Sequence, residues 1–263
     1  MSFDPISLAR TIVGLNEWLD RVSGPAGLMQ ERFDGGEFGA SYISVAIGDD
    51  SPYASANCNR IHLRGRDGGL TEAGLHNLIN RFGAVGVSKF FVWLSPGSET
   101  DVVRGWLRDA NLLRVPHVDY PTLARDVSSP QAATNDFVIR KIEASEAQEI
   151  SDHLQASSSL QFRRSIGTRD MFHLVAWDSD QPVASAALAT FEGLGYLGMA
   201  FTNEAYRRRG AQQALIAKRI EIARQCGCRV LASETLSVAE TSLSNLHKAG
   251  FTSLYDKEVY AHS

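Results

Sequence analysis

The sequence has few cysteines and no long apolar run. Its 263 residues include only 3 cysteines, Cys58, Cys226 and Cys228, which is too few for a disulfide framework. No apolar stretch approaches the ~18 residues that a membrane span requires. The opening residues, MSFDPISLAR, lack the basic and then apolar segments of a secretory signal. We therefore expect a cytoplasmic protein with no membrane partner.

A large excess of charge of one sign is also missing. The chain has 26 Lys and Arg against 30 Asp and Glu, for a formal net charge of −4. This balance excludes a protein held on nucleic acid by bulk charge, so we expect no nucleic-acid partner. Hydrophobic residues make up 44% of the chain, which is typical of a globular protein and argues against disorder.

A small, polar, uncharged segment at residues 128–135 divides the chain near its middle and is typical of a linker. We expect one domain over residues 1–127 and another over residues 136–263. Apolar spacing predicts helices that alternate with strands in both, so the fold class is α/β with a mixed sheet. The expected helices span residues 5–22, 71–84, 99–110, 144–155, 210–225 and 240–248. The expected strands span residues 41–47, 59–63, 90–94, 137–142, 174–177, 183–190, 194–202 and 230–233, with a turn at 95–97.

Similar segments in the two halves suggest a duplicated fold. Residues 86–92 resemble residues 227–231 at an offset of 141, and residues 106–112 resemble residues 246–251 at an offset of 139. Two helix–strand–helix–strand units at nearly one offset are typical of a duplication. The alternative is two ordinary α/β segments of unrelated origin.

Three consecutive arginines, Arg207 to Arg209, precede Gly210 where a strand is expected to lead into a helix. Cations at a helix N-terminus oppose the helix dipole by on the order of 0.3–1 kcal/mol each. A bound anion would reverse this effect, because the free amides at a helix start already favour anions. Gly210 has no side chain to keep a phosphate away. The pattern indicates a phosphate-bearing ligand, with a solvated basic turn as the alternative.

The pattern Arg-x-x-Gly-x-(Gly/Ala), placed between a strand and a helix, makes residues 136–263 resemble the GNAT superfamily of N-acetyltransferases. Arg207 to Gln212 carry the motif, Lys248 to Phe251 carry the closing Gly-Phe, and the order of expected elements fits throughout. The resemblance implies a tandem of GNAT-like folds. Residues 1–127 would be a degenerate copy with a structural or acceptor-shaping role, because Arg66 to Gly69 repeat Arg-x-x-Gly with an acidic residue inside the loop.

The resemblance also implies a co-substrate, acetyl-CoA or a related acyl-CoA, and no metal. The motif opens at Arg207, and its backbone amides would cradle the pyrophosphate at Arg208, Arg209, Gly210, Ala211, Gln212 and Gln213. Ala200, Phe201 and Thr202 would pair with the pantetheine arm like an added strand. An amide near Ala200 would stabilise the oxyanion, and Asn245 is a further candidate contact. The amine would attack the thioester directly, without a covalent enzyme intermediate.

Several positions depart from the family pattern. Gln212 stands where the family usually has Gly or Ala, so its side chain must point out of the phosphate cradle. Leu246 stands where the family often has a Tyr that protonates the leaving thiolate, and Ala239 where it often has Asn. Glu234, at the end of an expected strand, is the candidate general base, with a solvated acid as the alternative. Tyr196 is expected to pack rather than to line the acceptor side.

The expected acceptor is an unidentified amine of a small molecule or a protein. The leading alternative is a non-catalytic acyl-CoA-binding or sensor protein, motivated by Leu246 and Gln212. The spacing of Cys226 and Cys228 is not that of a metal or redox pair, and we expect both thiols to be buried. Residues 162–164 are expected to form a solvated loop. The oligomeric state is left open, with a homodimer among the options.

Overall fold

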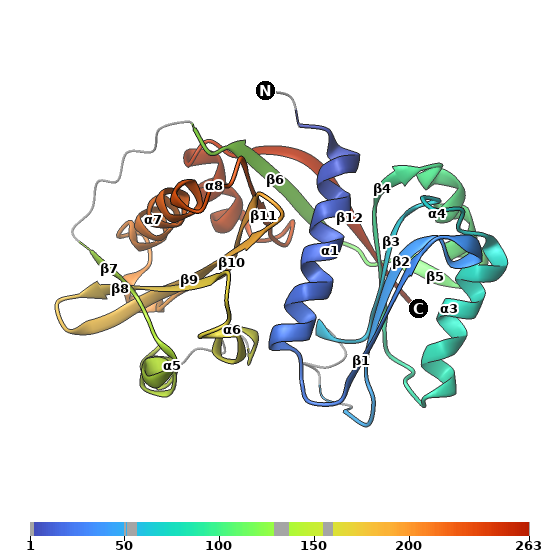
Figure 1. The fold of residues 1–263 in the computed structure, drawn as a ribbon, viewed down its shortest axis with the longest axis horizontal. Coiled ribbons are helices and arrows are strands. Elements are labelled where there is room, and N and C mark those ends of the chain that lie inside the picture. The colour runs from blue at the N-terminus through green and yellow to red at the C-terminus, as the bar shows by residue number, and fades with distance from the viewer. Residues whose placement is uncertain (1–2, 50, 52–56, 129–136, 155–159, 263) are drawn as a thin grey trace. The chain divides into compact units, whose positions relative to one another are not determined.

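The chain folds into two compact units. The structure, a computed structural model, describes residues 3–49, 51, 57–128, 137–154 and 160–262 (Figure 1). The C-terminal unit contains residues 122–235 and 239–254, and the N-terminal unit contains residues 2–121, 236–238 and 255–263. Apart from Ser128, the expected linker lies outside the described residues. No helix in these ranges is long and apolar enough to cross a membrane.

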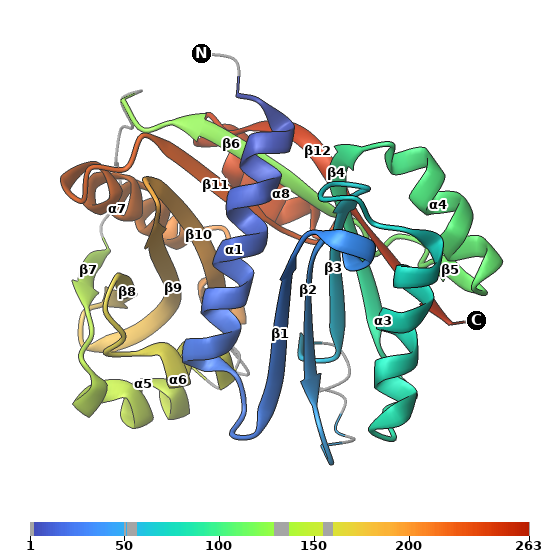
Figure 2. The same ribbon diagram turned by 45° about the vertical axis from the view of Figure 1, so that its right-hand side comes forward.

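In the N-terminal unit, one long helix lies against one face of a sheet and two helices cover the other face (Figure 2). The sheet has the order β1-β2-β3-β4-β12, in which β3 and β4 are parallel and the other neighbours are antiparallel. The helices are α1 (Pro5–Ser23), η1 (Gly36–Phe38), α3 (Glu72–Ala84) and α4 (Thr100–Asp109). The strands are β1 (Leu28–Asp34), β2 (Ala40–Ala46), β3 (Arg60–Gly65), β4 (Phe91–Ser98), β5 (Leu112–Arg114) and β12 (Thr252–His262).

The two faces of this sheet are held by different chemistry. Leu75 and Phe82 of α3 and Leu107 of α4 pack into an apolar core with the strands, which is the usual result of burying one amphipathic face. On the other face, the Asp20 carboxylate of α1 accepts hydrogen bonds from Arg60 at 2.6 Å and from the Tyr42 hydroxyl at 2.9 Å. All three side chains are buried, so α1 is fixed by a charged contact and not by apolar packing alone.

In the C-terminal unit the sheet has the order β6-β11-β10-β9-β8-β7, in which only β10 and β11 are parallel. Ile216 and Ile220 of α7 pack with Leu197, Leu231 and Leu246 in its core. The helices are η2 (Ala144–Glu146), α5 (Ala147–His153), α6 (Leu160–Ser165), η3 (Glu204–Tyr206), α7 (Ala211–Gln225) and α8 (Glu240–Lys248). The strands are β6 (Tyr120–Asp126), β7 (Val138–Lys141), β8 (Met171–Asp178), β9 (Gln181–Phe191), β10 (Leu194–Thr202) and β11 (Val230–Glu234).

Both units contain the same succession of elements. An antiparallel pair leads to a third strand, a helix, a strand parallel to the third, and a second helix. The matching elements α3 and α7, β4 and β11, and α4 and α8 begin 139 or 140 residues apart, at residues 72 and 211, 91 and 230, and 100 and 240. This spacing is the one that the sequence repeat predicts.

The last strand of each unit comes from the opposite half of the sequence. β6 follows α4 in the chain but pairs with β11, with Thr122 opposite Glu234 and Asp126 opposite Val230. β12 follows α8 but pairs with β4 through Glu258 to Tyr260. The compact units therefore do not coincide with a division of the chain at residues 128–135, because residues 122–127 and 255–263 have changed sides.

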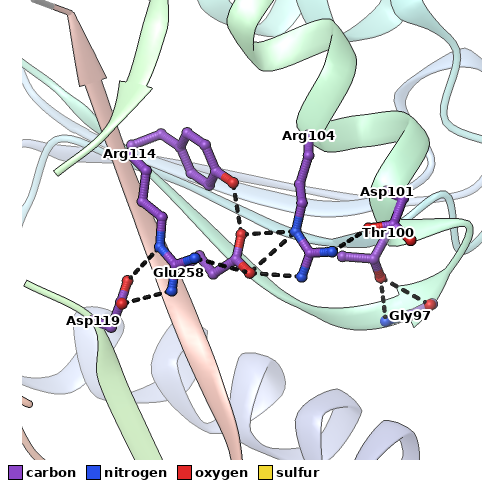
Figure 3. A network of polar contacts seen from close by, with 8 residues as sticks. Gly97, Thr100, Asp101, Arg104, Arg114, Asp119 and Glu258 are labelled. Atoms are coloured by element: carbon purple, nitrogen blue, oxygen red, sulfur yellow. Dashed lines mark hydrogen bonds and ion pairs between the residues drawn. The ribbon is translucent and has the colours of Figure 1, made fainter. Parts of the chain in front are cut away.

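A buried carboxylate ties β12 into the N-terminal unit (Figure 3). Glu258, only 6% exposed, accepts hydrogen bonds from Arg104 at 2.6 Å and from the Tyr260 hydroxyl at 2.6 Å. Arg114 lies 3.8 Å from the same carboxylate and pairs with Asp119 at 2.6 Å. Burial would raise the pKa of Glu258, but the hydrogen bonds from Arg104 and Tyr260 and the two guanidinium charges leave that pKa below its usual value.

Three expectations about local structure were wrong. β4 runs on through Ser98 instead of turning at residues 95–97, because the ladder with β3 shifts register there and a bulge tolerates Pro96. β1 was not expected, since no clear alternation marks it. Phe162 is buried on α6, stacked edge-on against His173, so residues 162–164 are helical and not a solvated loop.

Candidate functional site

The helix α7 begins at a residue that leaves its first amides uncapped by any side chain. Gly210 occupies the N-cap position with a φ of 89°, and the first turn contains no acidic residue. Arg208, two residues earlier, has a φ of 62°. Amides at a helix start that lack partners within the helix hold a positive potential. The conformation of this loop is therefore suited to an anion.

The three arginines of the loop are compensated unequally. Arg209 pairs with Asp178 at 2.9 Å, and its guanidinium lies 5.1 Å from the ring centroid of Tyr206. Arg207 has a longer contact of 3.8 Å with Glu204. Arg208 is exposed and makes no ion pair within the described residues. A solvated basic turn thus accounts for two of the charges, while the third is free to meet a ligand.

The equivalent loop of the N-terminal unit is closed by its own side chains. Gly69 repeats the left-handed backbone with a φ of 91°, but the Thr71 hydroxyl caps α3 by accepting from the Gly74 amide at 3.0 Å. The Asp67 carboxylate accepts from the Ser98 amide at 2.9 Å. Arg66 pairs with Glu99 at 2.6 Å. No comparable set of uncapped amides and unpaired cation is present in this described loop.

Next to the α7 start, β10 separates from β11 at a bulge. The parallel ladder between them ends at Tyr196, and the Ser233 hydroxyl then donates to the Leu197 carbonyl at 2.8 Å. The register with β9 shifts between Gly198 and Phe201, and Met199 has a φ of 52°. Beyond Leu197, no strand of the described residues pairs with this edge of β10. An unpaired strand edge can accept an extended ligand through main-chain bonds.

The glycines on β10 are explained by this geometry. A Cβ at Gly195 would meet Leu231 Cδ2 at 2.7 Å, so the close approach expected from the sequence is confirmed. Gly198 begins the expected bulge.

Gln212 points out of the loop, as the sequence predicts, but it contacts β10. Its amide nitrogen donates to the Phe201 carbonyl at 2.8 Å and to the Thr202 hydroxyl at 2.9 Å. It therefore engages two residues that are expected to hold the pantetheine arm. The next residue, Gln213, donates to the side-chain oxygen of Asn245 at 3.2 Å. The structure thus brings Asn245 to the first turn of α7.

Glu234 lies where β10 and β11 part, and it is half-buried. Its carboxylate accepts from the Thr122 hydroxyl at 3.0 Å and from the Tyr196 hydroxyl at 3.2 Å. Tyr196 is opposite Ala232 in the ladder, two residues before Glu234 and on the same face. That register could have revealed the Tyr196 contact from the sequence. The Thr122 contact could not be foreseen, because it depends on the exchanged strand β6.

Other expected positions contribute little polar chemistry. Leu246 is buried in the core with Phe251, so no proton donor stands at its place. Ala239 is the N-cap of α8 and makes no side-chain cap. Cys228 is buried as expected, but Cys226 is exposed, because it ends α7 as the C-cap at the surface. The described residues contain no group of three His, Cys, Asp or Glu side chains placed to hold a metal.

Comparison with known proteins places a family on this geometry. Residues 138–251 match the model of the Acetyltransferase (GNAT) family. The match confirms the expected GNAT acetyltransferase domain, and with it an enzyme of the acyltransferase class. No curated protein shows significant sequence similarity to this chain.

Solved structures extend the likeness in fold to the whole chain. A GCN5-related N-acetyltransferase from Kribbella flavida superposes with a TM-score of 0.67 at 13% identity, over 100% of this chain and 96% of its own. A GNAT-family acetyltransferase structure from Novosphingobium aromaticivorans gives a TM-score of 0.54 at 16% identity, over 98% of both chains. A tandem GNAT protein from the clavulanic acid biosynthesis pathway gives 0.58 at 11% identity, over 96% and 95%. At these identities the similarity establishes the mixed α/β fold.

Proposed function

We propose, from the GNAT acetyltransferase domain that residues 138–251 form, that this protein transfers an acetyl group from acetyl-CoA to an amine. One observation carries the proposal: the uncapped, acid-free start of α7 follows three arginines and adjoins the open edge of β10. Phosphates bind at such a helix start, and an amide-bearing arm can bind at such an edge.

The pyrophosphate would bind the amides of residues 208–213. Arg208, which has no ion pair among the described residues, would supply the compensating charge, and the pairs of Arg207 and Arg209 would keep the loop in place. Ala200, Phe201 and Thr202 would pair with the pantetheine arm. Gln212 would then have to share or release the Phe201 carbonyl that it now occupies.

The chemistry is a direct transfer. The amine nitrogen attacks the thioester carbonyl carbon, a C–N bond forms, and the C–S bond breaks with its electron pair left on sulfur. The amine loses one proton, and the leaving thiolate gains one from solvent. A main-chain amide near Ala200 would stabilise the oxyanion. Glu234, held by Thr122 and Tyr196, would accept the proton of the amine.

The acceptor is an amine of a small molecule or a protein. The N-terminal unit would serve a structural or acceptor-shaping role as a degenerate GNAT-like copy, because Thr71 and Asp67 close the loop that corresponds to the phosphate site.

A second candidate function is an acyl-CoA-binding or sensor protein without turnover. Two observations favour it: Leu246 is buried at the position of the expected proton donor, and Gln212 already occupies the Phe201 carbonyl. The two functions differ in one measurable property. With a broad panel of amines, sustained CoA release supports the transferase, whereas binding without release across the panel supports the sensor.

The test of the site is a calorimetric titration of acetyl-CoA into the wild-type protein and two matched variants. Gly210→Glu places a carboxylate and a side chain in the expected phosphate loop. Gly69→Glu makes the same change at the equivalent left-handed position of the N-terminal unit, where φ is 91° instead of 89°. We expect one site per chain in the wild type and in folded Gly69→Glu, and none in folded Gly210→Glu. Equal binding by all three proteins would refute the proposal.

A further inference from the structure

A buried arginine without a carboxylate partner lies behind the bulge of β10. Arg219 of α7 is only 2% exposed, and it makes no ion pair within the described part of the chain. Its guanidinium donates to the Ala187 carbonyl at 3.2 Å and to the Gly198 carbonyl at 3.5 Å, while Nε donates to Leu215 at 3.1 Å. A buried cation that is not paired is costly, so its presence needs an explanation.

The two carbonyls that Arg219 contacts are at the origin of the bulge. Gly198 and Ala187 form the last matched pair of the β9–β10 ladder before the register shifts. Met199, the next residue, takes the left-handed φ of 52°. The carbonyl of Gly198 and the amide of Met199 belong to one peptide group, so a cation on the carbonyl polarises that amide toward a ligand.

The N-terminal unit solves the same packing problem without a charge. The offset of 141 residues that aligns Gly69 with Gly210 aligns Leu78 with Arg219. It also aligns Leu75 with Ile216, and all of these helix positions except the two glycines are buried. A leucine therefore fills this place where the helix start is capped, and an arginine fills it where the helix start is open.

The field of Arg219 is weakly screened at the bulge. Burial lowers the pKa of Arg219 to about 9, and no neighbouring charge contributes to that shift. The guanidinium thus stays protonated at neutral pH. Since charge interactions are stronger inside a protein than in water, a negative group that develops at the open edge of β10 would be stabilised.

We propose that Arg219 is a positioning residue for the acyl transfer: it fixes the bulge of β10 and its charge stabilises the CoA thiolate that leaves. This inference rests on the acyl-CoA site proposed above. In the transfer, the electron pair of the broken C–S bond remains on sulfur. Arg219 acts on that charge through the bulge and does not donate a proton to it.

The experiment compares CoA with desulfo-CoA, which lacks the thiol, by calorimetry at pH 6.5 and pH 8.5. A free thiol has a pKa near ~8.5, and one charge at this range should lower it by about 1 unit in the complex. The ratio of CoA to desulfo-CoA affinity should therefore rise about fivefold between the two pH values in the wild type. A purely structural role would change both affinities together and leave the ratio as it is.

Two neutral variants and one control complete the design. Arg219→Met removes both the charge and the donors, while Arg219→Gln keeps an amide donor for the bulge carbonyls. Arg224→Met, on the same helix, removes an exposed arginine that donates to the Val127 carbonyl at 3.0 Å. We expect both Arg219 variants to lose the fivefold rise and Arg224→Met to keep it; if Arg219→Met does not fold, Arg219→Gln decides.

The outcomes separate this inference from the proposed function. A wild-type protein that binds neither CoA nor desulfo-CoA refutes the acyl-CoA site and the role of Arg219 with it. Binding of both compounds, with a pH-dependent ratio that survives in the folded Arg219 variants, overturns only the role of Arg219.

Discussion

Replacing Glu258 with glutamine should destabilise the N-terminal unit strongly for a single conservative change. The carboxylate is 6% exposed and is the shared acceptor of Arg104 and the Tyr260 hydroxyl, with Arg114 nearby (Figure 3). Glutamine keeps the shape but removes the charge and turns one acceptor into a donor, which then faces the guanidinium of Arg104. The free energy of unfolding should fall, because two cations lose their common counter-charge.

The size of this effect follows from the exposure of the partners. Breaking a fully buried ion pair costs ~3–5 kcal/mol. The arginines here are 42% and 47% exposed, so water compensates part of the loss and we expect about 2 kcal/mol. The matched control is Asp34→Asn, which breaks the exposed Arg32–Asp34 pair of 2.7 Å. That change should cost less than ~0.5 kcal/mol.

Urea unfolding at several pH values provides the assay. The pKa of Glu258 is lowered in the folded state, so its stabilisation is present above the ordinary carboxyl pKa and is lost as pH falls through the lower folded value. The difference between wild type and Glu258→Gln should therefore shrink in acid. A difference no larger than that of Asp34→Asn at neutral pH would refute the importance assigned to this contact.

The remaining predictions concern the C-terminal unit. Gln212→Ala frees the Phe201 carbonyl and should tighten acetyl-CoA binding about fivefold, the value of one net hydrogen bond, whereas Gln213→Ala should not; weaker binding by Gln212→Ala would contradict this. Glu234→Gln should lower kcat by ~10²-fold or more once an acceptor is found, with acetyl-CoA affinity unchanged; an unchanged kcat would exclude Glu234 as the base. Burial lowers the pKa of His173 to about 4, so folding opposes its protonation and stability should fall by about 2 kcal/mol between pH 7 and pH 5. Urea unfolding of His173→Gln, which can still hydrogen-bond Ser165, should show a correspondingly smaller fall; an equal fall would assign the loss to other groups.

Local features of the fold were well predicted where one segment contains all the information. Gly195 and Gly198 indicated the close approach and the bulge on β10, and both are present. The Arg-x-x-Gly motif placed the start of α7 at Gly210, since a strand, a turn and a helix follow one another without interruption there.

Features that depend on distant segments could not be predicted in this way. The exchange of β6 and β12 is a pairing choice between strands that are separated by more than a hundred residues, and neither strand has a local mark of its partner. The contact of Thr122 with Glu234 follows only from that exchange. Arg219 reads in the sequence as one more charged residue on a helix, and its burial against the bulge emerges only from the packing of α7.

The central claim is that the start of α7 and the open edge of β10 form one acyl-CoA site, and hydrogen exchange tests it most directly. Acetyl-CoA should slow amide exchange in peptides that cover residues 198–213, because the ligand would occupy those amides. Peptides that cover residues 60–74, the closed counterpart in the N-terminal unit, should exchange at the same rate with and without ligand. Slowed exchange at residues 60–74, or none at residues 198–213 at a saturating concentration, would contradict the account.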